Sequence, residues 1–167
     1  MSRSTRRRRL VLLLVLAALG LGLYWRPYQV QGSSMEPAYF DGDWVLSAPL
    51  WGAPQRGELV VFQAPDGSGR SMKRVAGLPG ESAQTIWQSL ATESEQPSIE
   101  TSSTIWGSES EGPPDLPQGS YFLLGDHLAN SIDSRHFGPV QRAAMGRRIV
   151  LRLFAADRPA SLGELAQ

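Results

Sequence analysis

Hydrophobic and polar residues follow different patterns before and after position 26. Residues 10–25 form an unbroken apolar run directly after an arginine cluster at positions 6–9. As a helix, sixteen residues extend roughly 24 Å, slightly less than the hydrocarbon core of a bilayer. The run therefore predicts one N-terminal transmembrane helix that Pro27 ends.

This apolar run also fits a cleaved signal peptide, because small residues at positions 18–22 resemble a cleavage site. We favour a retained anchor. Tyr24 and Trp25 lie where interfacial aromatic residues are expected, and the arginines place the N-terminus in the cytoplasm. Everything after Trp25 is then extracytoplasmic.

After Pro27, short β-prone runs alternate with turn signals such as Asp41-Gly42 and Pro79-Gly80. The predicted strands cover residues 28–31, 44–47, 58–64, 72–78, 121–125 and 147–154. Long helical periodicity is absent from this part of the sequence. These runs predict a mostly β fold, a compact antiparallel β domain of short strands. Residues 82–119 are rich in Ser, Glu, Gly and Pro, and we expect strand fragments and loops there.

Composition narrows the classes of function. The chain of 167 residues has no cysteine and two histidines, which argues against a zinc site and excludes a cysteine nucleophile. Six of its sixteen Lys and Arg residues lie in the first 26 positions, which contain no acid. The rest of the chain contains the other ten basic residues and all sixteen Asp and Glu residues, so it is net negative. A nucleic-acid-binding body would be basic instead.

The basic residues are all arginine except Lys73. Arginine stays charged at any working pH, whereas a buried lysine can lose its proton and act as a base. The alternative is that Lys73 is an ordinary surface charge in contact with water. Gly32-Ser33-Ser34 is a turn that can expose a hydroxyl next to converging backbone N–H groups, and serine becomes nucleophilic when a base is close. Residues 125–140 follow an apolar strand and are dense in charged and hydroxyl side chains, which is typical of a braced functional loop.

Together these segments resemble type I signal peptidases, membrane-bound serine proteases with a Ser–Lys dyad. The similarity rests on Ser34-Met35-Glu36-Pro37, on residues 56–62, on Lys73 to Glu81, and on residues 125–138 with Asn130-Ser131-x-Asp133-Ser134-Arg135. These motifs occur in the family's order behind an apolar anchor. His127 and Leu128 depart from the usual Asn-Arg pair.

The resemblance implies a role for each matching residue. Ser34 would be the nucleophile and Lys73 the general base, while Ser131 would hydrogen-bond and orient the lysine. Asp133 and Arg135 would form an ion pair that braces the site. The backbone N–H of Ser34 would be one oxyanion donor. Gly32 stands where some members place a second donor, a serine hydroxyl.

The resemblance also implies the reaction, removal of signal peptides from secretory preproteins at the outer face of the cytoplasmic membrane. Substrates would carry small residues before the cut, and the pockets that select them would be lined by Tyr28, Val30, Met35 and Met72. No metal or cofactor is expected, and the partners are preproteins and the lipid bilayer, not nucleic acid. The expected organisation is a cytoplasmic basic segment at 1–9, an anchor at 10–26 and a catalytic domain at 27–167.

Three alternatives remain open at this stage. The chain could process a pilin or one dedicated partner in a conjugation system. It could be an inactive, membrane-anchored relative that binds other proteins. A third interpretation makes His127 the base of a Ser-His-Asp triad, in which case Lys73 would have no role in its motif.

Overall fold

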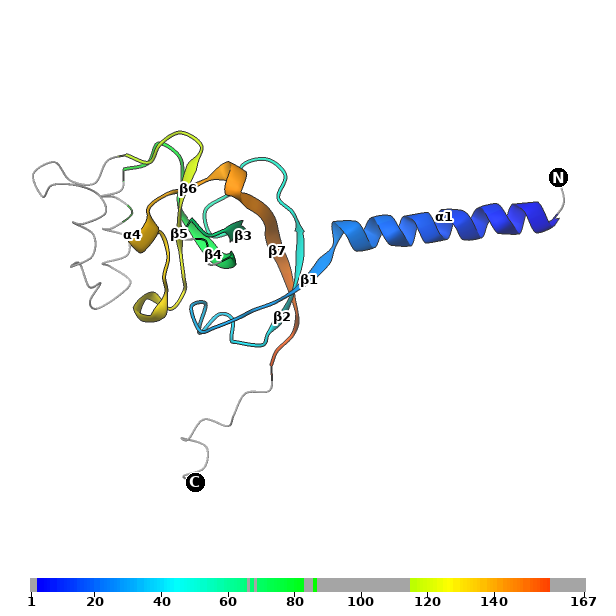
Figure 1. The fold of residues 1–167 in the computed structure, drawn as a ribbon, viewed down its shortest axis with the longest axis horizontal. Coiled ribbons are helices and arrows are strands. Elements are labelled where there is room, and N and C mark those ends of the chain that lie inside the picture. The colour runs from blue at the N-terminus through cyan, green and yellow to red at the C-terminus, as the bar shows by residue number, and fades with distance from the viewer. Residues whose placement is uncertain (1–2, 66, 68, 83–85, 87–114, 157–167) are drawn as a thin grey trace, which may run out of the picture.

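A computed structural model of the chain describes residues 3–65, 67, 69–82, 86 and 115–156. Its first element is the long helix α1 (Arg3–Tyr24), which projects away from a β domain formed by the rest of the described chain (Figure 1). α1 continues up to Tyr24, and the next residues enter a strand. The cause is local, since Pro27 lacks an amide hydrogen and disfavours helical backbone at the residue before it.

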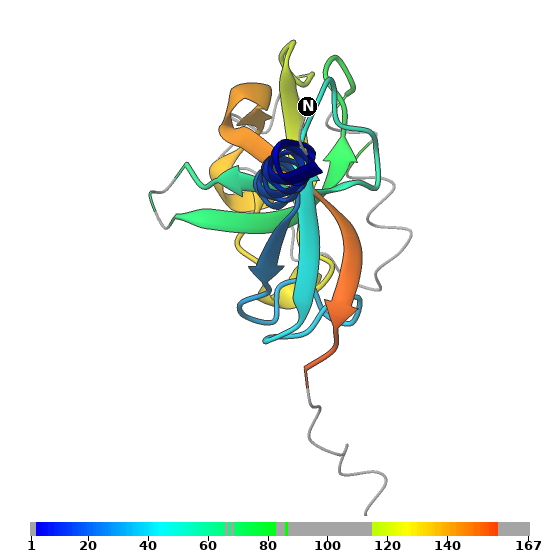
Figure 2. The ribbon, with the colours of Figure 1, turned by 90° about the vertical axis from the view of Figure 1, so that its right-hand side faces the viewer.

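The strands are β1 (Arg26–Gln29), β2 (Trp44–Pro49), β3 (Leu59–Gln63), β4 (Arg70–Gly77), β5 (Ser120–Leu124), β6 (Val140–Gln141) and β7 (Met145–Phe154). They form one seven-stranded sheet in the order β1-β2-β7-β3-β4-β5-β6, and every neighbouring pair is antiparallel. The sheet is strongly twisted (Figure 2). The prediction of a mostly antiparallel β domain is confirmed.

β7 is the longest strand, and it lies in the interior of the sheet between β2 and β3. Register shifts interrupt its pairing with both neighbours, as expected where a bulge bends a strand. Short helical segments connect the last strands: η2 (Leu128–Asn130), α4 (Ser134–Phe137) and η3 (Arg142–Ala144). The loop that holds η2 and α4 joins β5 to β6.

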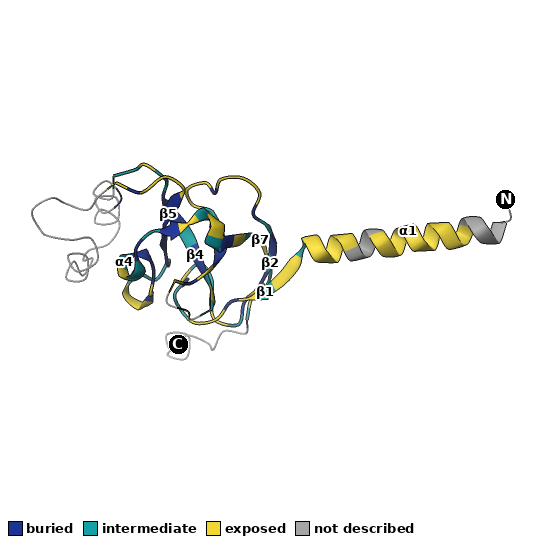
Figure 3. Ribbon diagram, turned by 45° about the horizontal axis from the view of Figure 1, so that its top comes forward, coloured by how far each residue is buried: buried dark blue, intermediate teal, exposed yellow. Residues whose placement is uncertain are grey.

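Burial is concentrated in part of the sheet, whereas the helix α1 is exposed (Figure 3). β5 is buried at all five positions and β3 at four of five, which matches their continuous apolar runs. One core cluster forms around Val60, Phe62 and Leu123, and a second around Val30, Met35 and Met72. In a third cluster, Ile86 and Leu116 pack with Phe122 and Leu124, so parts of the 82–119 segment touch the sheet.

Positions 83–85 and 87–114 of the 82–119 segment, which we predicted as strand fragments and loops, lie outside the described residues. In α1, the described leucines at positions 10, 12, 13, 14, 16, 21 and 23 are all exposed. Within the part of the chain that the structure describes, none of the helices combines the length and hydrophobicity that a membrane crossing requires. The transmembrane segment stays a prediction.

Candidate active site

Ser34 lies in the connection between β1 and β2. The turn begins at Gly32, which has φ +75°, a backbone region that glycine enters without a steric cost. The Gly32 N–H donates to Asp41 Oδ1 at 2.7 Å, and the Glu36 N–H donates to the Ser33 carbonyl at 3.1 Å. From the other side, the backbone N–H of His127 donates to the Ser34 carbonyl at 3.1 Å. These bonds hold the Ser34 backbone in place.

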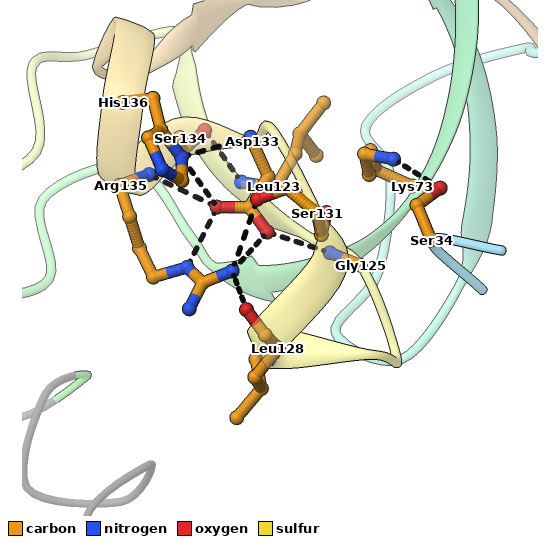
Figure 4. A network of polar contacts seen from close by, with 10 residues as sticks. All are labelled: Ser34, Lys73, Leu123, Gly125, Leu128, Ser131, Asp133, Ser134, Arg135 and His136. Atoms are coloured by element: carbon orange, nitrogen blue, oxygen red, sulfur yellow. Dashed lines mark hydrogen bonds and ion pairs between the residues drawn. The ribbon is translucent and has the colours of Figure 1, made fainter. Parts of the chain in front are cut away.

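Lys73 lies in the middle of β4, where its backbone pairs with Val60 of β3. Its side chain is only 3% exposed and is hydrogen bonded to Ser34, with 2.6 Å between Lys73 Nζ and Ser34 Oγ (Figure 4). Burial lowers the pKa of Lys73 below its ordinary value, because removing water disfavours the ammonium form. Asp133 and Asp126 raise this pKa in opposition, and Arg135 lowers it. The net direction is downward, toward a neutral amine.

Asp133 organises the loop between β5 and β6. Its fully buried carboxylate accepts from Arg135 Nε at 2.8 Å and Arg135 Nη2 at 2.9 Å. It also accepts from the backbone N–H of Gly125 at 3.0 Å, and it caps α4 in a capping box with His136. The ion pair that the sequence predicted between Asp133 and Arg135 is therefore present (Figure 4).

A family model described as signal peptidase, peptidase S26, matches residues 4–154. The chain belongs to this family. Among curated proteins, signal peptidase I V of Bacillus subtilis (strain 168) is 32% identical over 68% of this chain and 77% of its own length. Signal peptidase I of Bacillus licheniformis is 29% identical over 76% of this chain and 75% of its own length. The chain is thus a serine peptidase, a hydrolase, as the sequence predicted.

Among solved structures, a signal peptidase I from Enterococcus faecalis V583 is 27% identical. The match covers 56% of this chain and 94% of that chain, with a TM-score of 0.38.

The structure of this peptidase brings together most of the side chains that the motifs pointed to, although they come from distant segments. Ser34 and Lys73 contact each other directly, and Figure 4 shows Gly125 and Ser131 near this pair, on the side of the Asp133 network. A cavity of about 380 Å³ opens beside the pair. Its lining consists of Gln31, Gly32, Ser33, Ser34, Ala64, Ser71, Lys73, Asn130, Ile132 and Phe137.

Ser131 differs from its expected hydrogen bonding. Its side chain is buried, as a residue inside the site should be, but its hydroxyl has no hydrogen-bond partner among the described residues. The expected bond from Ser131 to the Lys73 amine is therefore absent from this conformation. A buried hydroxyl without a hydrogen bond is energetically unfavourable, so a bond from Ser131 to the Lys73 amine would lower the free energy if the site rearranges around a substrate.

The predicted pocket residues occupy a different place from the cavity lining. Val30, Met35 and Met72 are buried together in the second core cluster, with Tyr28 packed against it. None of these four side chains is among the residues that line the cavity beside Ser34. Their part in selecting the substrate stays a prediction.

His127, which the triad hypothesis made the base, contacts the nucleophile only through its backbone among the interactions of the described residues. Its Nδ1 atom is buried without a hydrogen-bond partner there. The neighbouring carboxylate of Asp126 is bound by Arg74 in a two-pronged pair, with Nε and Nη2 at 2.7 and 2.6 Å. Among the described interactions, the His127 side chain therefore contacts neither Ser34 nor Asp126, whereas Lys73 Nζ contacts Ser34 Oγ directly.

Sequence reasoning missed two contacts that connect the nucleophile loop and β4 to the loop after β5. Arg74 binds Asp126, and the side chain of Asn130 donates to the Ser33 hydroxyl. The only sequence signal for the contact between Arg74 and Asp126 was that Arg74 directly follows Lys73 in the chain. No sequence signal connects Asn130 with Ser33, which lies 97 positions away.

Proposed function

We propose that this peptidase removes signal peptides from exported preproteins, with Ser34 as the nucleophile and Lys73 as the general base. The observation that carries the proposal is the 2.6 Å contact between the Ser34 hydroxyl and a buried lysine amine. Burial favours the neutral amine, which is the form that can accept the hydroxyl proton. The substrate class comes from the relatives of the chain, which are signal peptidases I.

The geometry suggests the following sequence of steps. Neutral Lys73 takes the proton from Ser34 Oγ while the oxygen attacks the carbonyl carbon of the scissile peptide. The resulting lysine ammonium then gives this proton to the leaving amine, and an ester between Ser34 and the signal peptide remains. Lys73 next deprotonates a water molecule, which hydrolyses the ester and restores the free enzyme.

Asp133 and Arg135, in the loop after β5, would support these steps without touching the scissile bond. Asp133 holds Arg135 and the Gly125 N–H, and the Arg135 guanidinium also donates to the Leu128 carbonyl at 2.6 Å. Ser131 follows Asn130 at the end of η2, so this bracing sets where its hydroxyl lies. We propose that Ser131 bonds the lysine amine during turnover and that Asp133 and Arg135 position it.

We also propose that residues 10–26 anchor the enzyme in the cytoplasmic membrane, with residues 27–167 on the extracytoplasmic side. The support is the row of exposed leucines on α1 behind an arginine cluster that would remain in the cytoplasm. This topology would place the dyad on the side of the membrane where exported chains emerge. The small-residue preference before the cut is part of the same proposal.

Cleavage of a preprotein by the detergent-solubilised protein tests this function. Wild type should release the mature chain, cut after a small residue, and Ser34→Ala should not. His127→Ala should cleave at nearly the wild-type rate, because its backbone N–H, the group that contacts Ser34, survives the substitution. Wild type that leaves the preprotein intact, or a folded His127→Ala protein that is inactive, would refute the proposed mechanism.

A further inference from the structure

Attack on a carbonyl creates a negatively charged oxygen that needs more than one hydrogen-bond donor. The Ser34 N–H has no acceptor among the described residues and is free to be one of them. Gly32 cannot supply a second: it has no side chain, and its N–H already binds Asp41 Oδ1. A second donor must come from another part of the cavity.

Asn130 reaches the same cavity from the opposite loop. Its Nδ2 donates to Ser33 Oγ, and both residues line the cavity together with Ser34 and Lys73. A carboxamide nitrogen carries two hydrogens. The bond to Ser33 uses one of them, and the other has no acceptor among the described residues.

The segment that carries Asn130 is tied to the nucleophile's own backbone. The Asn130 N–H donates to the His127 carbonyl at 3.0 Å, and the His127 N–H donates to the Ser34 carbonyl at 3.1 Å. Arg135 bonds the Leu128 carbonyl from below this turn. These bonds hold the backbone of Asn130, and the bond to Ser33 holds its side-chain amide. A donor held in this way needs little reorganisation when charge develops nearby, which is the condition for effective electrostatic stabilisation.

We propose that Asn130 is a catalytic residue whose second Nδ2 hydrogen completes the oxyanion hole with the Ser34 N–H. The assignment rests on the proposed function. When Ser34 Oγ bonds to the carbonyl carbon, the π electron pair moves onto the carbonyl oxygen and the Ser34 proton moves to Lys73. The oxygen then accepts from the Ser34 N–H and from Asn130 Nδ2. On collapse the pair returns, the peptide C–N bond breaks, and the amine takes the proton from Lys73.

Ser33 has a supporting part in this arrangement. Its hydroxyl oxygen accepts one hydrogen of Asn130 Nδ2 and so holds the amide at the lining of the cavity, with the second hydrogen left to donate. Ser33→Ala removes this hold but leaves the donor. We expect a loss of activity smaller than that of any change at Asn130.

The test compares Asn130→Ala and Asn130→Asp in preprotein cleavage, with kcat and KM measured separately. Aspartate keeps the size of asparagine and can accept a hydrogen bond from the Ser33 hydroxyl, the reverse of the observed bond, but it has no donor and adds negative charge beside the oxyanion. Both variants should lose about 100- to 1000-fold in kcat, the cost of one oxyanion donor, with KM within about threefold of wild type. Gln118→Glu makes the same amide-to-carboxylate change at an exposed position outside the cavity and should match wild type.

A purely structural role for Asn130 predicts a different order, in which Asn130→Asp keeps its activity and Asn130→Ala loses it together with thermal stability. That result, or Asn130 variants within about threefold of wild-type kcat, would overturn the assignment alone while wild type still cleaves. Wild type that fails to cleave any preprotein would refute the proposed function and this assignment with it. Thermal unfolding of each variant shows whether a loss of activity reflects a loss of folding.

Discussion

Burial of Lys73 within β4 determines which side chains could replace it. The amine lies against the Ser34 hydroxyl in a place that is almost closed to water. An arginine there would keep its positive charge and could not accept a proton. This explains, on the proposed mechanism, why a chain that otherwise uses arginine has a lysine at this position.

Lys73→Arg should therefore be nearly as inactive as Lys73→Ala, with a loss of about 100- to 10 000-fold, the usual contribution of a general base. In wild type the pKa of Lys73 lies below the ordinary lysine value of 10.5, so the neutral amine forms at a lower pH than in a free lysine. Activity should therefore rise as the pH rises through the lowered pKa of Lys73. Because Lys73 is the only lysine, selective carbon-13 labelling gives one side-chain NMR signal whose titration can be compared with the rate profile. Substantial activity in Lys73→Arg, or an unshifted titration, would exclude Lys73 as the base.

Gly125 is a residue whose lack of a side chain matters. A methyl group there would lie 2.2 Å from Ser131 Oγ and 2.4 Å from the Ser34 carbonyl oxygen, closer than such atoms can approach. Gly125→Ala should displace Ser34 and lower kcat at least about 100-fold, since errors of about 1 Å in a catalytic group cost this much. Gly146→Ala, where the added methyl group meets nothing within 4 Å, is the matched control. Equal activity of the two variants would contradict the predicted displacement.

The loop between β5 and β6 is the element that connects the ion pairs to the catalytic groups. Its hydrogen bonds run to β5 through Ser134 and Leu123, to the loop's own backbone through Arg135, and to the nucleophile through His127. A loop with so many buried partners behaves as part of the core. Its sequence had suggested a braced loop, and the bracing residues Asp133 and Arg135 lie as the motif implied.

Asp133→Asn should destabilise the fold, because it leaves the mostly buried Arg135 guanidinium without its counter-charge. Removing one partner of a buried ion pair costs about 3–5 kcal/mol, and the free energy of unfolding in urea should fall by an amount near the lower end because asparagine keeps some hydrogen bonds. Glu81→Gln removes a charge from the more exposed pair with Arg56 and should cost about 1 kcal/mol or less. A smaller effect of Asp133→Asn than of Glu81→Gln would show that the loop does not depend on the buried pair.

At the scale of the whole molecule, side-chain hydrogen bonds join the end of α1 to the sheet, in addition to the covalent connection through the backbone. Arg147 of β7 donates to the Tyr24 carbonyl at the end of the helix and to Ser47 Oγ in β2, and Ser47 in turn donates to the Arg26 carbonyl. These contacts link the helix end to the interior strand β7. The helix therefore has a defined exit from the β domain (Figure 1).

If residues 10–26 are a retained anchor, the full chain should stay with membranes after a carbonate wash. Added protease should digest residues after 27 from the extracytoplasmic side only, because the arginine cluster holds the N-terminus in the cytoplasm. Mass spectrometry of the washed membranes measures both outcomes. Recovery of a soluble form that begins near Leu21 or Leu23 would instead show a cleaved signal peptide.

The sequence by itself determined the local features of this protein. Runs of β-prone residues between turn signals predicted most of its strands, and the order of four motifs pointed to the peptidase family. These features depend on neighbouring residues and on short spacings, which can be read without knowing the fold.

Only the tertiary structure decided which groups meet. Sheet order places β4 beside β3 and β5, so that Lys73 reaches Ser34 across 39 positions of sequence and Asn130 reaches Ser33 across 97. It also decided that the Gly32 N–H is already used and that the Ser131 hydroxyl lacks its expected partner. The reason is physical, because a hydrogen bond forms only when its donor and acceptor are placed to within a few tenths of an ångström. The packing of distant segments sets this placement, and no local sequence pattern contains it.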